Sequence, residues 1–290
     1  MFTHHFDYSS TLKNIGRVEH ITGAPSPVLI RQIPNSNLFD GVLPWPYIHL
    51  SHSNEIKELI NAYPALVTIT GNVAPSSTID KAIEKNQYLH RYKEHFVYDP
   101  RLPLILSART RRHIKNGCKF NNTFLNANNN PSLPKEIVNI YGQFLNRKNL
   151  PGNFFLFQEN HFELFCKKDD AKVFITRDSQ LRLSASALGY LDKADLHLVH
   201  IIISDLGLKN DAGYALMNEI IAYAKANNLQ VFFGGMPSQN IDGLYLFKKR
   251  WSNRLMQSHL LKIIVQPKQY LELCDGNQTN NFFPAYRNPF

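Results

Sequence analysis

A loop directly before a predicted helix carries residue types that bind phosphate. The loop covers residues 206–212, and the helix continues from Gly213. Free amide groups at a helix start carry partial positive charge and bind anions, and a lysine in the loop adds a formal charge. The pattern indicates either a cofactor-binding site or an ordinary helix start capped by Asn210 or Asp211. The candidate cofactor-binding residues are Lys209, Asn210, Ala212 and Gly213.

Basic side chains form two clusters in a chain whose net charge is +9. Such clusters attract phosphates of a nucleotide cofactor, a tRNA or a sugar nucleotide, although a solvated basic surface has the same composition. The first cluster contains Arg109, Arg111, Arg112, Lys115 and Lys119, and the second contains Lys248, Lys249, Arg250 and Arg254.

Composition indicates a folded, soluble protein without a metal. The chain has 290 residues, 43% of them hydrophobic, which is enough for a buried core. We find no leader segment and no uninterrupted apolar stretch of about 18 residues, and three widely spaced cysteines fit neither a disulfide framework nor a metal clip. We therefore expect a cytoplasmic protein. His197 and His200 fall in one expected strand, where a spacing of three would place them on opposite faces, so we expect no metal site.

The carboxy-terminal half has a clear order of expected elements. Three strands at 172–176, 181–191 and 196–204 are joined by short turns and predict an antiparallel meander. A helix to about residue 227 and a strand at 230–233 then complete a βαβ unit. A helix at 243–252, a strand at 260–265 and a short helix from Pro267 follow.

Earlier residues give weaker signals. Strands are expected at 28–33, 47–50 and 65–70, the last ended by Gly71, with a helix at 54–62. Ser107 is placed to cap a basic helix that Gly117 would end, and the asparagine-rich residues 121–134 are expected to form a loop. Further helices are expected at 135–146 and 154–167.

Three segments resemble the Fem-type members of the GNAT acyltransferase superfamily. They are residues 107–114, 213–224 and 243–251, the last with the sequence GLYLFKKRW after a Gly-Gly strand end. The resemblance extends over most of the chain and implies a mixed α/β, GNAT-like fold. It also implies two GNAT-like halves in tandem, at residues 1–106 and 107–290. Members of this group include aminoacyl-tRNA-dependent peptidoglycan transferases and bacterial acetyltransferases linked to surface polysaccharides.

The resemblance implies an acyl donor but leaves its identity open. Acetyl-CoA or another acyl-CoA is the predicted donor, and the loop at 206–212 would hold its pyrophosphate. However, this loop lacks the glycine pattern of ordinary GNAT enzymes, and Asp211 would repel phosphate unless it caps the helix. Fem-type transferases that use aminoacyl-tRNA do not need the loop, so aminoacyl-tRNA is the alternative donor.

The same likeness implies a catalytic role for Lys248. Its ammonium group would neutralise an oxyanion or a phosphate, unless it is a solvated lysine of an exposed helix. Phe247 stands where ordinary GNAT enzymes often have a proton-donating tyrosine, and Tyr245 is a weak substitute because it lies on another side of the helix. The acceptor amine must lose a proton, and the candidate bases are Asp242, Asp205 and His200. Their ordinary roles would be a helix cap, a turn residue and a core histidine.

Residues that could bind the acceptor come from several segments. His95, Tyr98, Asp99, Tyr286 and Arg287 resemble pieces of the polysaccharide-linked acetyltransferase branch, although interface packing would use the same residue types. Arg111, Arg112 and Tyr245 complete this predicted substrate-binding set. Cys118 has no indicated histidine partner and is expected to be a buried or incidental thiol.

We therefore predict an N-acyltransferase that moves an acyl group from acyl-CoA to a small-molecule amine. Family likeness suggests an amino sugar or a sugar nucleotide as the acceptor. Direct attack by the amine would gain most of its rate from proximity. The alternatives are a Fem-type transferase that uses aminoacyl-tRNA and a non-catalytic binding module with this fold.

Overall fold

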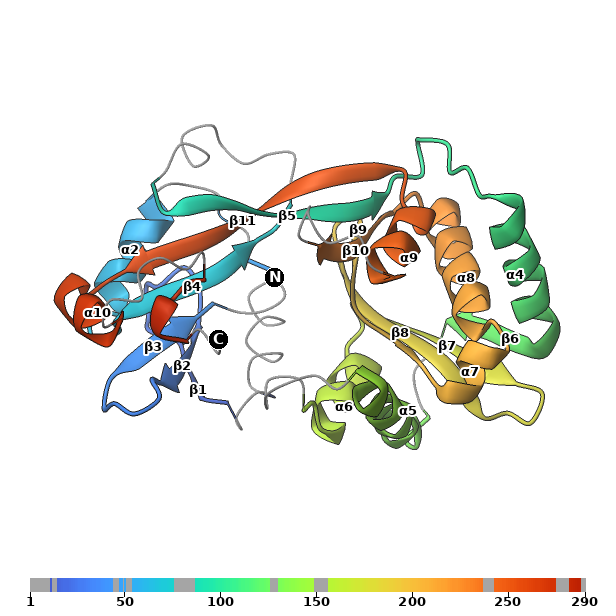
Figure 1. Cartoon of the computed structure of the whole chain (residues 1–290), viewed down its shortest axis with the longest axis horizontal. Coiled ribbons are helices and arrows are strands. Elements are labelled where there is room, and N and C mark those ends of the chain that lie inside the picture. Colours follow the sequence, from blue (N-terminus) through green and yellow to red (C-terminus); the bar gives the residue numbers. More distant parts are fainter. Residues whose placement is uncertain are drawn as a thin grey trace. The chain divides into compact units, whose positions relative to one another are not determined.

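The computed structural model divides into two compact units, which we describe separately (Figure 1). Unit 1 contains Met1–Lys93 and Gln257–Phe290, and unit 2 contains Glu94–Met256. The structure describes residues 11, 15–43, 47–48, 50, 54–75, 87–125, 130–148, 156–236, 243–274 and 282–287.

Unit 2 is built on a mixed sheet. Its strands follow the order β5-β10-β9-β8-β7-β6, and β5 belongs to this unit from Glu94 onward. The pair β10–β9 is parallel, and the other neighbours are antiparallel. The meander and the βαβ unit predicted from the sequence are therefore confirmed. The strand bounds are β5 Leu89–Tyr98, β6 Asn121–Leu125, β7 Ala171–Asp178, β8 Leu183–Asp192, β9 Asp195–Ile203 and β10 Gln230–Met236.

Helices α4 (Ala108–Phe120), α8 (Ala212–Ala226) and α9 (Gly243–Trp251) pack on one face of this sheet. The apolar residues of α8 recur every three or four positions and therefore form one side of the helix, which is buried. Its buried side chains meet strand residues and the fully buried Trp251 of α9 in one core. Burial on this scale is the main stabilising contribution to such a unit.

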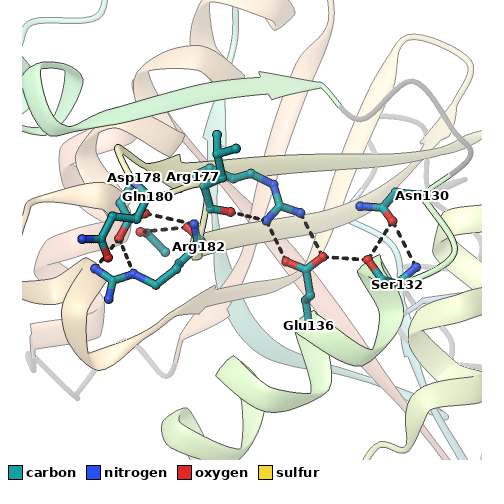
Figure 2. A network of polar contacts seen from close by, with 9 residues as sticks. Asn130, Ser132, Glu136, Arg177, Asp178, Gln180 and Arg182 are labelled. Atoms are coloured by element: carbon teal, nitrogen blue, oxygen red, sulfur yellow. Dashed lines mark hydrogen bonds and ion pairs between the residues drawn. The ribbon is translucent and has the colours of Figure 1, made fainter.

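Helices α5 (Leu133–Lys148) and α6 (Glu159–Lys167) contact strands of the same sheet and pack on each other. A polar network ties α5 to β7 (Figure 2). The guanidinium group of Arg177 donates to both carboxylate oxygens of Glu136, at 2.7 and 3.0 Å, and Ser132 donates to the same carboxylate. In the adjoining turn, Asp178 accepts hydrogen bonds from the amides of Gln180 and Arg182. The paired, bidentate geometry fixes the start of α5 against the strand.

Unit 1 contains neighbouring strands in the order β1-β2-β3-β4-β11, and β11 belongs to this unit from Gln257 onward. The pair β3–β4 is parallel, and the other neighbours are antiparallel. Its core gathers Val28, Ile30, Ile56, Leu59 and Ile69. The bounds are β1 Arg17–Glu19, β2 Val28–Gln32, β3 Phe39–Val42, α2 Asn54–Ala62, β4 Thr68–Val73, β11 Arg254–Ile264, α10 Pro267–Cys274 and η2 Ala285–Arg287.

Several element boundaries differ from the sequence predictions. The expected loop at 121–134 contains strand β6, which pairs with β7, and a short helix α7 (Asp205–Lys209) precedes α8. Strand β4 continues past Gly71, where an added Cβ would lie 2.7 Å from the Cβ of Leu43. Helix α4 continues past Gly117, which lies so close to α8 that an added Cβ would be 2.5 Å from the carbonyl oxygen of Asp211. Both glycines therefore allow close packing and do not end an element.

The two histidines of β9 share one face of the sheet, contrary to the prediction. The pairing of β9 with β8 shifts by one residue, because Leu188 is opposite His200 while Gly189 is opposite Leu198. A β-bulge inserts an extra residue and changes the alternation of side chains. His197 stacks on Phe232, and His200 contacts α5 and α6, whereas Leu198 faces α8.

The two compact units contain different residues from the two halves predicted from the sequence. Residues 257–290 belong with the amino-terminal residues in unit 1. The tandem halves at 1–106 and 107–290 therefore stay a prediction about the repeat within the fold. Among the described residues, none of the helices combines the length and the apolar character needed to cross a bilayer.

Candidate functional site

Strands β9 and β10 pair over a short distance and then separate. Their parallel register joins three residue pairs and ends at Phe232 opposite His197. Strand β9 nevertheless continues to Ile203 and β10 to Met236. Each strand also carries an irregularity near this point, β9 before His200 and β10 between Phe232 and Gly235. Bulges bend strands and increase their twist, which explains the separation.

The ammonium group of Lys248 lies beside the bulged part of β10. Its Nζ atom donates to the carbonyl oxygen of Gly235 at 3.4 Å, and a Cβ added to Gly234 would be 3.3 Å from it. Gly234 has a φ of 81°, a conformation that glycine adopts without strain. Lys248 is half-buried. The sequence therefore places a cation where the two parallel strands separate.

Aromatic contacts hold α9 in the position that aims Lys248 at β10. The ring of Tyr245 meets Phe96 of β5 edge-on, with centroids 5.1 Å apart. Tyr214 of α8 stacks on His113 of α4 at 4.7 Å, and its hydroxyl accepts a hydrogen bond of 2.7 Å from Arg250 of α9. Helix α9 is thereby fastened to α8 and to β5 within unit 2.

The predicted phosphate-binding helix start is covered by other parts of the protein. Ala212 and Gly213 are buried, and the carboxylate of Asp211 accepts a hydrogen bond of 2.8 Å from Asn116 and lies 3.0 Å from Nδ1 of His113. Lys209 is exposed, and Asn210 is half-buried. The amide of Gly207 in α7 donates to Ser204, so α7 caps its own start. Of the four candidate cofactor residues, only Lys209 and Asn210 reach the surface.

The candidate bases lie in different surroundings. His200 is buried on the sheet face opposite α8 and α9, so the sheet separates it from Lys248. Its Nε2 atom is 2.9 Å from Nε2 of His161, and burial lowers the pKa of His200 to about 3. Asp205 is exposed and forms an ion pair with Arg147 of α5. Asp242 lies outside the described residues.

The structure places the backbone of one predicted substrate residue beside Gly235. His95 of β5 is directly opposite Gly235, whose carbonyl accepts from Lys248. Tyr98 is buried in the core, opposite Val231. The carboxylate of Asp99 accepts hydrogen bonds from Arg101, which lower its pKa to about 2. Arg111 and Arg112 are exposed on α4.

Comparisons with solved structures identify the fold. FemX matches with a TM-score of 0.64 and 12% identity, covering 91% of this chain and 92% of that one. The L-PGS of Bacillus licheniformis matches with 0.64 and 13% identity, covering 90% and 87%. The C-terminal domain of a putative lysylphosphatidylglycerol synthetase from Agrobacterium fabrum matches with 0.61 and 13%, covering 94% and 93%. The chain has a Fem-type, GNAT-like fold. No protein-family model matches it, and no curated protein matches it by sequence.

In this Fem-type fold, Tyr286 and Arg287 lie in unit 1 and contact a buried carboxylate. Arg287 forms an ion pair with Asp40, which is fully buried, and Tyr286 lies 2.7 Å from the hydroxyl of Thr68. Arg31 also donates to Asp40, at 3.1 Å. These contacts attach the last helical turn to β3 and β4. The structure therefore gives both residues a packing role in unit 1.

Sequence reasoning missed the residues that surround Lys248 in this Fem-type fold. The Gly234-Gly235 pair was assigned to a strand end, although consecutive glycines in a strand pattern are a known signal of a bulge. The contact of Tyr214 with His113 and Arg250 joins residues far apart in the sequence, and no local pattern indicates it. Among the described residues there is no group of three or more metal-ligating side chains.

Proposed function

We propose that this chain transfers an acyl group to an amine at the point where β9 and β10 separate. The observation that carries the proposal is the early end of their parallel pairing, with Nζ of Lys248 at the adjoining Gly235 carbonyl. Main-chain groups on the facing strand edges can bind an extended donor arm as a further strand. A half-buried ammonium group stabilises the oxyanion that forms at the reacting carbonyl.

The reaction is direct aminolysis. The amine nitrogen attacks the carbonyl carbon, a C–N bond forms, and the C–S or C–O bond to the donor breaks. The amine gives its proton to a base. A thioester donor leaves as a thiolate, and an ester donor leaves as an alcohol after the protonated base returns this proton. Binding both substrates side by side supplies much of the rate gain.

The first candidate donor is an acyl-CoA, with an amino sugar or a sugar nucleotide as acceptor. The separated strands favour this donor because its pantetheine arm is extended and carries amide groups. Lys209 and Asn210 are the surface residues available to its phosphates, since the amide groups at Ala212 and Gly213 are buried.

The second candidate donor is an aminoacyl-tRNA, and one specific observation favours it. The starts of α7 and α8 are closed by Ser204 and by α4, which leaves little room for a pyrophosphate there. An aminoacyl ester does not require a pyrophosphate site at this position. The likeness in fold to FemX and to two L-PGS proteins agrees with aminoacyl transfer as the reaction class.

The proposed base is Asp242, directly before α9. Of the other two candidates, His200 lies across the sheet from Lys248, and Asp205 is paired with Arg147. His95, whose backbone is opposite Gly235, remains a proposed acceptor-binding residue. Tyr245 remains a proposed substrate contact on α9.

Calorimetry with acetyl-CoA and with an aminoacyl-tRNA tests the donor. Binding of acetyl-CoA, followed by transfer of a labelled acetyl group to an amino sugar, supports the first candidate. Binding of the tRNA alone supports the second. Binding of neither by the folded protein would leave a non-catalytic module and overturn the proposed function.

A further inference from the structure

The segment that leads into α4 exposes aliphatic side chains. Ile105 is 89% exposed and Leu102 is 43% exposed. Their neighbours Leu104 and Leu106 pack against the core of unit 2. Because these two leucines anchor the segment, the side chain between them points away from the protein. The apolar side chain of Ile105 is therefore in contact with water over most of its surface, which is energetically unfavourable.

Helix α4 carries a row of basic side chains next to this segment. Thr110 and Gly117 are its buried positions, so the opposite side of the helix faces solvent. That side carries Arg112, Lys115 and Lys119, spaced at three and four residues. Helix α4 contains no acidic residue, and none of these three side chains forms an ion pair within the described part of the chain.

Among the residues that the structure describes, the acidic groups near residues 101–106 and α4 form no ion pair with this row. Asp99 is paired with Arg101, and the charge of Asp195 also acts on Arg101. The carboxylate of Asp211 is held by Asn116 and His113 on the side of α4 that faces α8. Glu219 of α8 lies near Cys118, which is not on the row formed by Arg112, Lys115 and Lys119. The exposed row is therefore a local site of positive potential next to exposed aliphatic side chains.

We propose that residues 101–106 and the exposed row of α4, together the docking face, bind the surface of an anionic lipid bilayer. The basic side chains contact lipid phosphates, and Leu102 and Ile105 enter the boundary between headgroups and acyl chains. The charge selects anionic lipids. The aliphatic side chains select a bilayer over a single-stranded nucleic acid, because bases are bound by stacking on aromatic rings. The proposal is independent of the acyl donor.

Co-sedimentation with vesicles tests the docking face in the full chain. We expect binding to vesicles of phosphatidylglycerol and phosphatidylcholine in equal parts, and little binding to phosphatidylcholine alone. The double variant Lys115→Glu/Lys119→Glu should bind at least roughly twentyfold more weakly, since each lost basic residue costs about fivefold. Ile105→Asp should also abolish binding, and Ile105→Trp should strengthen it because tryptophan favours the interface.

Matched control variants distinguish binding through this docking face from nonspecific binding through other parts of the surface. Lys225→Glu/Lys268→Glu has the same net charge as the α4 double variant, and both lysines are exposed on other helices. Leu271→Asp changes an equally apolar side chain that is 55% exposed on α10. We expect both controls to bind as the unchanged protein does. Equal loss in the controls, or binding that ignores both changes at Ile105, would overturn the proposal, as would binding to single-stranded RNA without binding to vesicles.

Discussion

The Nε2 atom of His161 on α6 lies 2.9 Å from the Nε2 atom of His200 on β9. Both imidazoles are buried among Tyr141, Phe157 and Phe162. At this distance one ring donates its proton to the lone pair of the other, which requires the accepting ring to be neutral. The pair therefore joins a helix to the sheet through a hydrogen bond that depends on pH.

The pair predicts a loss of stability in mild acid. Burial lowers the pKa of His161 to about 2 and that of His200 to about 3, against an ordinary value near 6.5. The unfolded chain takes up protons below pH 6.5, whereas the folded protein does not until its own lower pKa values are reached. Stability is thus complete above pH 6.5 and falls below it, by about 1.4 kcal/mol per pH unit for each histidine. Urea unfolding at pH 7.5, 6 and 5 measures this slope.

A double variant isolates the contribution of this pair. His161→Leu/His200→Leu replaces both partners with apolar groups and should flatten the pH dependence between 6.5 and 5. His20→Gln changes an exposed histidine and should leave the slope as it is. A slope that persists in the double variant would show that other groups cause it.

Replacing the buried carboxylate of Asp40 should greatly lower the stability of unit 1. Its side chain is in contact with the guanidinium groups of Arg31 and Arg287, and burial lowers the pKa of Arg31. Asp40→Asn would leave two partly buried cations without their counter-charge, at a cost of about 3 kcal/mol. Glu19→Gln breaks the exposed pair with Arg17 and should change stability by less than about 1 kcal/mol. Chemical unfolding of both variants gives the comparison, and equal effects would contradict it.

The spacing of apolar residues in the sequence predicted most elements of the fold, because this spacing indicates which side of a helix or strand is buried. Helix α2 begins and ends at the predicted residues, and the meander and the βαβ unit follow from alternation and three-and-four spacing. Strand β6 was missed because its asparagine-rich sequence has low strand propensity and is held by pairing with β7. The bulge at His200 was missed because an extra residue in a strand depends on the partner strand.

The site was less predictable because its parts meet through tertiary contacts. The glycine-lysine segment of α9 indicated Lys248, but only the fold brings its ammonium group to Gly235. The sequence of the loop before α8 favours phosphate binding, yet the start of α8 is buried. Asn116 of α4, almost a hundred positions away, binds Asp211, and Gly213 packs against the side chain of Ile203. A helix start binds an anion only where the anion can reach it.

Replacing Gly234 by a residue with a Cβ should lower both the stability and the activity of the protein. Its φ of 81° strains any residue with a Cβ, and an added methyl group would lie 3.3 Å from Nζ of Lys248. Gly234→Ala should therefore lower stability by about 1–2 kcal/mol and displace the ammonium group. Gly142→Ala is the control, because the space beside this α5 glycine is open and alanine favours a helix by about 1 kcal/mol. Thermal unfolding together with a transfer assay measures both variants.

Replacing Lys248 should reduce acyl transfer without unfolding the protein. Its Nζ atom lies 3.4 Å from the carbonyl oxygen of Gly235, beside the bulged end of β10, so truncation should remove the proposed oxyanion stabilisation. Lys248→Ala should lower turnover roughly a hundredfold or more, with little change in donor affinity. Lys249→Ala removes the same charge from an exposed neighbour and should leave turnover unchanged, which separates a local role from general charge. Equal turnover in both variants would remove Lys248 from the mechanism, because a cation that acts at the reacting carbonyl cannot be exchanged for one that lies over the ring of Tyr245.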